Sequence, residues 1–498
     1  MPLLSLPNEL LVAIFENPQF PPHFLCILAL SCRRLHFLAL PIYFARKGMP
    51  LPSKSAIITL QEDERDMLAA LNMALFLTSM EDMTLIFPHP SCVSIYPLLP
   101  HLRRVRRFIS RFSALGRITL QLDTQTSVCN LVGDDGALRA WSCALCDLLN
   151  AVVERCTDLT VEYGYFTRSY ILVARTPKGI RRIVKALRKL IKPRDPFSGA
   201  SWEFRRSPEQ GRASVHRTIR ASSARNLTAL HIQSGALVLP PCLAWTLSLF
   251  SSNSITTLSI CNISLERRLW NPVLTLIAKA APSLTNVTLS GLEYITDVEI
   301  LGFCARIPRL TTLEIGLNEE TRGFPTNCAK GPFPQFNHLE HLKAPANFIL
   351  YLLRPQPCFP KLQSLSVWFH GPRDIRTIAA RLVAIGDAMQ ARRISPLLSV
   401  SVLLLFNDLH LDLDAMVKLP HEYKKALGLV GGLDLVVWPS TVAQVASWIN
   451  MFPSAKQITI STRFEVDMEM LFRELAKNIS APRTASINGT IRTLECIT

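Results

Sequence analysis

The chain contains 498 residues, of which 49% are hydrophobic and 18% charged, a balance that excludes a largely disordered protein. Its net charge of +16 is concentrated in residues 101–117 and 176–220, which carry +6 and +10, so the chain is not uniformly basic. No basic N-terminal region precedes an apolar run, and no apolar run is long enough to cross a bilayer. We therefore expect a protein of the cytoplasm or nucleus that makes no membrane contact, with most of its 13 cysteines reduced.

The first fifty residues predict short helices. Pro7 suits the first turn of a helix because its missing N–H needs no partner there, and apolar residues follow at helical spacing: Leu10, Leu11, Ile14 and Phe15. A second helix is predicted from Phe24 to Leu35, with Pro41 ending it or starting a third. Three short helices cannot bury all of these side chains alone, so part of their surface must pack on a partner or on the rest of the chain.

Two segments of this region resemble the F-box: Leu6-Pro7-x-Glu9-Leu10-Leu11-x-x-Ile14-Phe15 and Leu30-Ser31-Cys32-Arg33-Arg34-Leu35-His36. The second segment, followed by Leu-Ala-Leu-Pro, is most similar to the F-box proteins abundant in fungi. The resemblance covers residues 4–48. It departs from the family at Glu16–Phe20, where a hydrophobic residue usually closes the first helix.

The resemblance implies that residues 1–48 form a three-helix module that binds the Skp-type adaptor of a cullin ligase. The residues that it assigns to this contact are Leu6, Pro7, Leu10, Leu11, Ile14 and Phe15. A different interpretation of the same residues is a helical cap that only shields the end of the following array.

A repeated pattern, Leu-x-x-Leu-x-Leu, predicts a repeat array. Its first positions are Leu227, Ile255, Leu284, Leu310, Leu339 and Leu362, which gives steps of 28, 29, 26, 29 and 23 residues. Periods of about 20 to 29 residues with this pattern are typical of leucine-rich repeats, in which a short strand is followed by a returning helix. The Asn271-Pro272 pair is predicted to cap and start one such helix.

We therefore predict an α/β fold, in which the three-helix module (1–48) precedes a leucine-rich-repeat-like solenoid with parallel strands inside and helices outside. Residues 49–99 are expected to form a helical connector and an imperfect first repeat. The solenoid is expected to occupy 100–498, with a loop or insertion at 195–224. The array resembles the leucine-rich repeats that often follow an F-box. Among the six best repeats, only Asn318 and Asn347 keep the Asn or Cys of the ninth position.

Two clusters of basic residues form a candidate surface for an anionic partner. Its members are Arg103, Arg104, Arg106, Arg107, Arg181, Arg182, Lys185, Arg188 and Lys189. The second cluster lies in Lys178–Arg194, where apolar residues at helical spacing predict one buried face. Two interpretations stay open: a solvated basic face, or a surface for an acidic or phosphorylated protein target or a nucleic acid backbone.

No motif for catalysis, a cofactor or a metal ion is found. A phosphate-binding P-loop, a Gly-x-Gly-x-x-Gly turn after a strand and a His-Glu-x-x-His helix are all missing. The pair Cys143-x-x-Cys146 has no further zinc ligands at matching distance. Together with this lack of motifs, the F-box resemblance implies a non-catalytic, substrate-recruiting subunit of a cullin-type (SCF) ubiquitin ligase, with no catalytic residues and no cofactor. The alternative is a leucine-rich scaffold or nucleic-acid-associated protein that acts outside any ligase.

Overall fold

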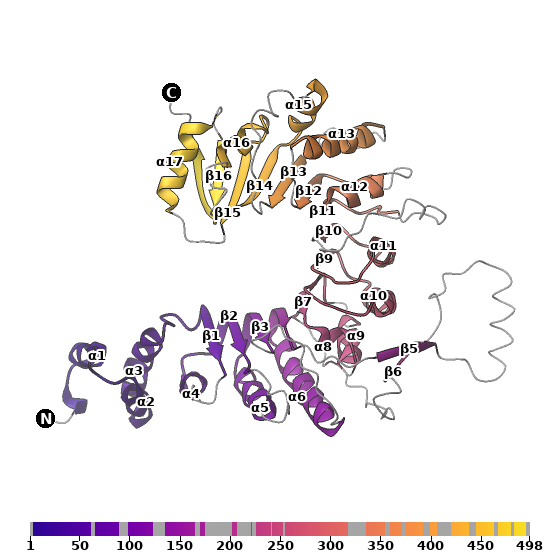
Figure 1. Cartoon of the computed structure of the whole chain (residues 1–498). Helices are drawn as coiled ribbons and strands as arrows, with labels where there is room; N and C mark the ends of the chain where they lie inside the picture. Colours follow the sequence, from indigo (N-terminus) through magenta and orange to yellow (C-terminus); the bar gives the residue numbers. More distant parts are fainter. Residues whose placement is uncertain are drawn as a thin grey trace, which may run out of the picture. The chain divides into compact units, whose positions relative to one another are not determined.

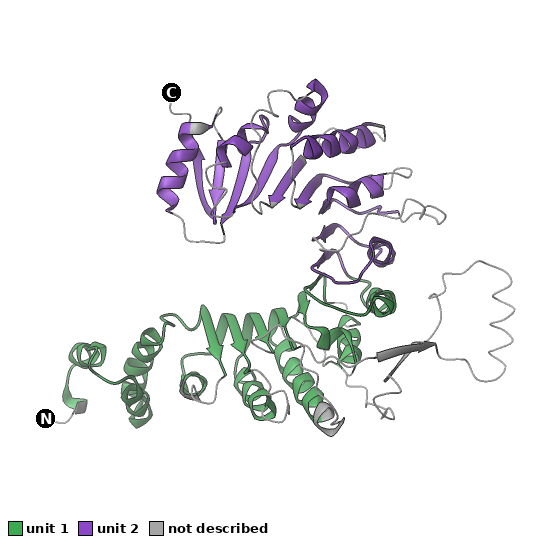
Figure 2. Cartoon of the chain, viewed as in Figure 1, with its two compact units in different colours: residues 1–283 green, residues 284–498 purple. Residues whose placement is uncertain are grey.

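A computed structural model places the chain in an α/β fold of parallel strands and connecting helices (Figure 1). Two compact units, residues 1–283 and 284–498, are considered separately as unit 1 and unit 2 (Figure 2). The structure describes residues 3–60, 65–88, 98–122, 135–164, 170–174, 202–206, 221, 226–240, 242–251, 254–316, 335–353, 359–370, 375–391, 399–405, 420–437, 445–462, 467–479 and 483–494.

Three helices open unit 1 after a 3-10 turn, and we call residues 3–48 the N-terminal module. They are α1 (Asn8–Glu16), α2 (Pro22–Ser31) and α3 (Arg33–Arg46). The predicted second helix runs too far, because Cys32 is extended, with φ −160° and ψ 162°, and separates α2 from α3. Pro41 lies inside α3 and does not mark its start.

The end of α3 is set by a glycine. Gly48 has a φ of +80°, a left-handed conformation that glycine adopts without the steric cost of a Cβ atom. The Gly48 amide donates to the Ala45 carbonyl at 3.1 Å, and the Met49 amide donates to the Phe44 carbonyl at 2.8 Å. This pair of bonds is a Schellman motif, which satisfies carbonyls that the end of a helix leaves open.

Six strands of unit 1 pair in sequence order, and every pair is parallel. They are β1 (Ser55–Thr59), β2 (Ser79–Ile86), β3 (Ala114–Gln121), β4 (Cys156–Glu162), β7 (Ala229–Gln233) and β8 (Thr257–Cys261). The helices of this part are α4 (Arg65–Met73), α5 (Leu98–Ile109), α6 (Asp135–Val153), α8 (Gly235–Val238), α9 (Leu243–Phe250) and α10 (Arg267–Ala280). The parallel series therefore begins at Ser55, within the segment that the sequence assigned to a connector and an imperfect repeat.

A separate antiparallel pair of strands lies between β4 and β7 in the sequence. Its strands are β5 (Tyr170–Ala174) and β6 (Trp202–Arg206). The strand β6 falls within the predicted loop or insertion at 195–224. Apart from β6 and residue 221, that segment lies outside the described residues, as does the predicted basic helix at Lys178–Arg194.

Unit 2 continues the same strand-and-helix alternation. Its strands are β9 (Asn286–Ser290), β10 (Thr312–Ile315), β11 (His341–Pro345), β12 (Ser364–His370), β13 (Ser399–Leu405), β14 (Gly432–Val437), β15 (Gln457–Thr462), β16 (Arg483–Ile487) and β17 (Thr490–Leu494). Neighbours are parallel except β16 and β17, which form a closing antiparallel pair. The helices are α11 (Asp297–Cys304), α12 (Ala346–Leu353), α13 (Ile375–Ala391), α15 (His421–Leu427), α16 (Val445–Asn450) and α17 (Met468–Asn478).

The strand register agrees with the repeat phrase of the sequence. In unit 1, Ala229 pairs with Thr257, and each lies two residues after a predicted first position. In unit 2, the same offset holds for the row of paired residues Asn286, Thr312, His341 and Ser364. The prediction of an α/β array of parallel strands joined by helices is confirmed.

The helices cover one face of the strands in each unit (Figure 1). In β7 and β9 every second side chain is buried, as expected for strands with one packed face. The helices supply the matching apolar side chains; α5, for example, buries Leu102, Val105, Phe108 and Ile109. This one-sided packing, in which each repeat contacts its neighbours, is solenoid-like.

Candidate functional site

The N-terminal module exposes an unusual number of apolar side chains. Seven of the fifteen exposed large hydrophobic side chains in the described part of the chain lie between residues 4 and 37. They are Leu4, Leu10, Ile14, Phe24, Ile27, Leu30 and Phe37. Because soluble surfaces seldom gather apolar groups in this way without a reason, the module is a candidate protein-binding surface.

Helix α1 divides the predicted contact residues into two groups. Leu10 and Ile14 lie one turn apart and are 52% and 40% exposed, whereas Leu11 and Phe15 are fully buried. Pro7 is exposed and Leu6 is half-buried. The exposed side chains of α1 can therefore contact a partner directly. Leu11 and Phe15 pack into the interior of the module and so fix the position of α1. Phe24, Ile27 and Leu30 form a second exposed stripe on α2, which the sequence analysis did not select.

Arg34 attaches the chain before α1 to α3. Its guanidinium donates to the carbonyls of Leu4, at 2.7 Å, and Leu6, at 2.5 Å, and its Nε donates to Asn8 Oδ1 at 2.8 Å. Arginine suits this role because its planar group presents five donors in fixed directions. The predicted contact residues Leu6 and Pro7 are thus positioned by a side chain from another helix.

Arg46 holds the first loop of the module, where the sequence departs from the F-box pattern. Its guanidinium donates to the carbonyls of Phe15, Asn17 and Phe20. The Phe20 ring lies between Phe15 and Phe24, with centroid distances of 5.8 and 6.2 Å. Sequence analysis quoted Arg34 within the F-box-like segment but assigned this role to neither arginine, because bonds to carbonyls 26 to 31 residues away leave no local pattern.

His36 connects the module to the first repeat of unit 1. The imidazole is 5% exposed, with Nδ1 3.2 Å from the Ala29 carbonyl, and Nε2 accepts from the Leu75 amide at 3.1 Å. This pair of contacts requires the tautomer that carries its proton on Nδ1. The Phe76 ring packs against His36 at 6.2 Å and against Phe37 at 6.0 Å. The module is thereby packed against the start of the array.

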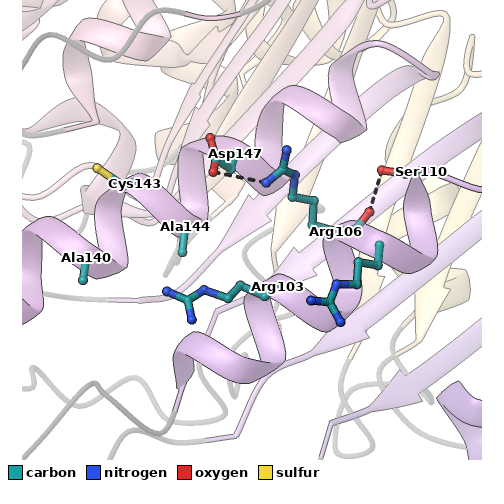
Figure 3. Close-up of a pocket in the computed structure, with 8 residues that line it drawn as sticks. Arg103, Arg106, Ser110, Ala140, Cys143, Ala144 and Asp147 are labelled. Atoms are coloured by element: carbon teal, nitrogen blue, oxygen red, sulfur yellow. Dashed lines mark hydrogen bonds and ion pairs between the residues drawn. The ribbon is translucent and has the colours of Figure 1, made fainter.

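The first basic cluster lines a groove between α5 and α6, which we call the α5–α6 groove (Figure 3). Its volume is about 580 Å³, and its lining residues are Arg103, Arg106, Arg107, Ser110, Ala140, Cys143, Ala144 and Asp147. The Arg106 guanidinium contacts the Asp147 carboxylate at 3.3 Å, and both side chains are about half exposed. Arg104, the fourth predicted arginine, is half-buried and does not line the groove.

The second basic cluster was predicted on a helix at Lys178–Arg194. Its predicted members Arg181, Arg182, Lys185, Arg188 and Lys189 lie outside the described residues. Within the described part of the chain, the predicted surface for an anionic partner is therefore represented by the arginines of α5.

A charged row lies on the strand face of unit 1. Asp158 on β4 contacts Arg117 on β3 and His231 on β7, each at 3.3 Å. Partial burial raises the pKa of the Asp158 carboxyl, but the contacts with His231 and Arg117 outweigh it and leave that pKa below its ordinary value. The row fixes three neighbouring strands and keeps Asp158 ionised at neutral pH.

The two cysteines of the Cys-x-x-Cys pair occupy different environments. Cys143 is exposed, whereas Cys146 is buried with its sulfur 3.9 Å from that of Cys242 on the neighbouring repeat. The hydrogen bond to the Cys242 thiol and burial both raise the pKa of the Cys146 thiol, so this thiol stays protonated.

Among the described residues, no group of three or more His, Cys, Asp or Glu side chains could hold a metal ion. Nor does any helix in the described ranges have the length and apolar character that crossing a membrane requires.

No protein-family model matches the chain, and no curated protein sequence matches it.

Proposed function

We propose that this chain is a non-catalytic adaptor that recruits targets to a cullin-type (SCF) ubiquitin ligase. In this proposal, the N-terminal module binds a Skp-type adaptor protein, and through it a cullin, while the repeat array binds the target protein. Ubiquitin transfer is left to other subunits. The protein would act in the cytoplasm or nucleus, where such ligases operate.

The observation that carries this proposal is the exposed apolar surface of α1 and α2. The F-box resemblance selected Leu10 and Ile14 from the sequence, and both are exposed in the structure. Exposed apolar side chains on two helices provide the contact area from which stable protein interfaces are built. The parallel array supports the second half of the proposal, because stacked repeats of strands and helices commonly present surfaces that bind other proteins.

The experiment is a direct competition between partner classes. The purified full-length chain is incubated with a Skp-type adaptor in one series, and with RNA and duplex DNA in another. We expect the chain to retain the adaptor at both low and high salt concentration, because the contact of the N-terminal module with the adaptor is mainly apolar.

The alternative function is a scaffold or nucleic-acid-associated protein that works outside any ligase. The observation in its favour is the row of arginines on α5. Retention of RNA or DNA, lost at high salt and without any binding of the adaptor, would establish this alternative.

A further inference from the structure

We propose that the α5–α6 groove is a binding site for a phosphorylated peptide segment, separate from the N-terminal module. The proposal concerns the outer helices of unit 1 and does not depend on which protein the module binds.

Two matching stripes build the groove. Arg103, Arg106 and Arg107 on α5 and Ser110, directly after its last residue, recur at the spacing i, i+3, i+4 and i+7, which places them on one side of the helix. On α6, Ala140, Cys143, Ala144 and Asp147 recur at the same spacing. The first stripe supplies positive charge, and the small residues of the second leave the space that the groove occupies (Figure 3).

The arginines retain unused hydrogen-bond donors. Arg106 is engaged by Asp147 through one nitrogen, Nη1. Arg103 and Arg107 make no ion pair or hydrogen bond among the residues that the structure describes, and both are exposed. Their Cβ atoms are separated by one turn, about 5–6 Å, so both guanidinium groups can reach the oxygens of one phosphate.

The ligand chemistry follows from the charges in the groove. Three arginines face a single carboxylate, so an anion is favoured, and arginine is the residue best suited to a phosphate group. A volume of about 580 Å³ fits a few residues of a peptide. The Asp147 carboxylate accepts hydrogen bonds, which the amides of a peptide can donate.

The same carboxylate argues against a nucleic acid as the ligand. A nucleic acid presents a phosphate at every step and contacts a long positive track, whereas these arginines span only about 6 Å of helix. A continuous polyanion would also bring a phosphate against Asp147. A single phosphate within a peptide avoids this repulsion.

The test uses the full-length chain and a degenerate peptide library with one fixed phosphoserine, together with the same library unphosphorylated. We expect the immobilised chain to retain the phosphorylated library and to release the unphosphorylated one. The double variant Arg103→Ser/Arg107→Ser should weaken retention at least about tenfold, since it removes two charged donors. The matched control is Arg309→Ser/Arg473→Ser, which removes two exposed arginines outside the groove and should retain the library as the wild type does.

A second measurement requires no variant. Cys143 lines the groove and is exposed, so its alkylation rate, read by mass spectrometry, should fall when the retained phosphopeptide is bound. Cys26 and Cys32 in the N-terminal module should react at unchanged rates.

Equal retention of the two libraries, normal retention by the double variant, or unprotected Cys143 would each overturn the proposal. Stronger retention of a short single-stranded RNA than of the phosphopeptides would reassign the groove to nucleic acid. Binding of the Skp-type adaptor is measured on the same variants. It should not change, so failure of the groove and failure of the N-terminal contact remain distinguishable.

Discussion

Replacing Leu10 and Ile14 by Ala tests the proposed partner surface quantitatively. Full burial of a Leu or Ile side chain contributes roughly 1.5–3 kcal/mol. Leu10 and Ile14 are 52% and 40% exposed, so burial of the remaining surface in a complex would supply about 1.4–2.8 kcal/mol for the pair. The double variant should therefore bind a Skp-type adaptor about 10- to 100-fold more weakly.

Titration calorimetry with the purified full-length chain measures this change. Because each side chain is only partly buried in the module, the variant should stay folded and should lose less thermal stability than a variant that truncates a fully buried residue. The matched control, Leu429→Ala/Met470→Ala, truncates side chains that are 57% and 54% exposed outside the module, and it should bind normally. A dissociation constant for Leu10→Ala/Ile14→Ala within twofold of the wild type would refute the reasoning.

Phe15→Ala distinguishes a contact residue from an interior one. The side chain is fully buried, so truncation should destabilise the module by about 3–5 kcal/mol. Loss of binding in this variant should accompany a loss of thermal stability larger than that of Leu10→Ala/Ile14→Ala, whose side chains are only partly buried. Binding lost without any change in stability would place Phe15 in the contact itself.

Three further predictions concern the folded chain. Arg34→Lys should destabilise the start of the module by roughly 1–2 kcal/mol, because a lysine cannot reproduce the fork of bonds; unchanged hydrogen exchange in residues 4–9 would contradict this. Asp158 has a lowered pKa, so its contribution to stability should be complete above the ordinary value of 3.8 and disappear as the pH falls through the lowered one. Urea unfolding at several pH values should show this loss, and Asp158→Asn should remove it. Gly116→Ala should cost about 1–3 kcal/mol, since the new Cβ would lie 2.3 Å from the Glu81 carbonyl oxygen. Gly235→Ala, whose Cβ meets nothing within 4 Å, is the control in thermal melts. A melting temperature of Gly116→Ala equal to that of Gly235→Ala would argue against a close approach at Gly116.

Helix boundaries show where local patterns are insufficient. Asn271-Pro272 was predicted to start a helix, but α10 begins at Arg267 and Pro272 lies within it. Trp270 and Val273, on either side of the pair, are both buried, so packing extends the helix past a residue that local preferences place at its start. Cys32 shows the converse, because an apolar run that reads as one helix is divided so that α2 and α3 can pack together.

The sequence by itself determined the repeat. Its apolar phrase recurs at every strand from β7 to β12, and the paired residues of these strands lie two positions beyond the predicted first residue. This was predictable because each strand is short and buries alternate side chains, so a local pattern specifies both the strand and its register.

Only the tertiary structure decided which residues form the candidate surfaces. Leu10 and Leu11 are neighbours of the same residue type, yet the packing of α1 on α3 buries one and leaves the other exposed. The α5–α6 groove joins residues about 40 positions apart, and Arg34 and Arg46 donate to carbonyls 26 to 31 residues away. Such pairings depend on which helices become neighbours in space, and a periodicity read along one helix contains no information about that.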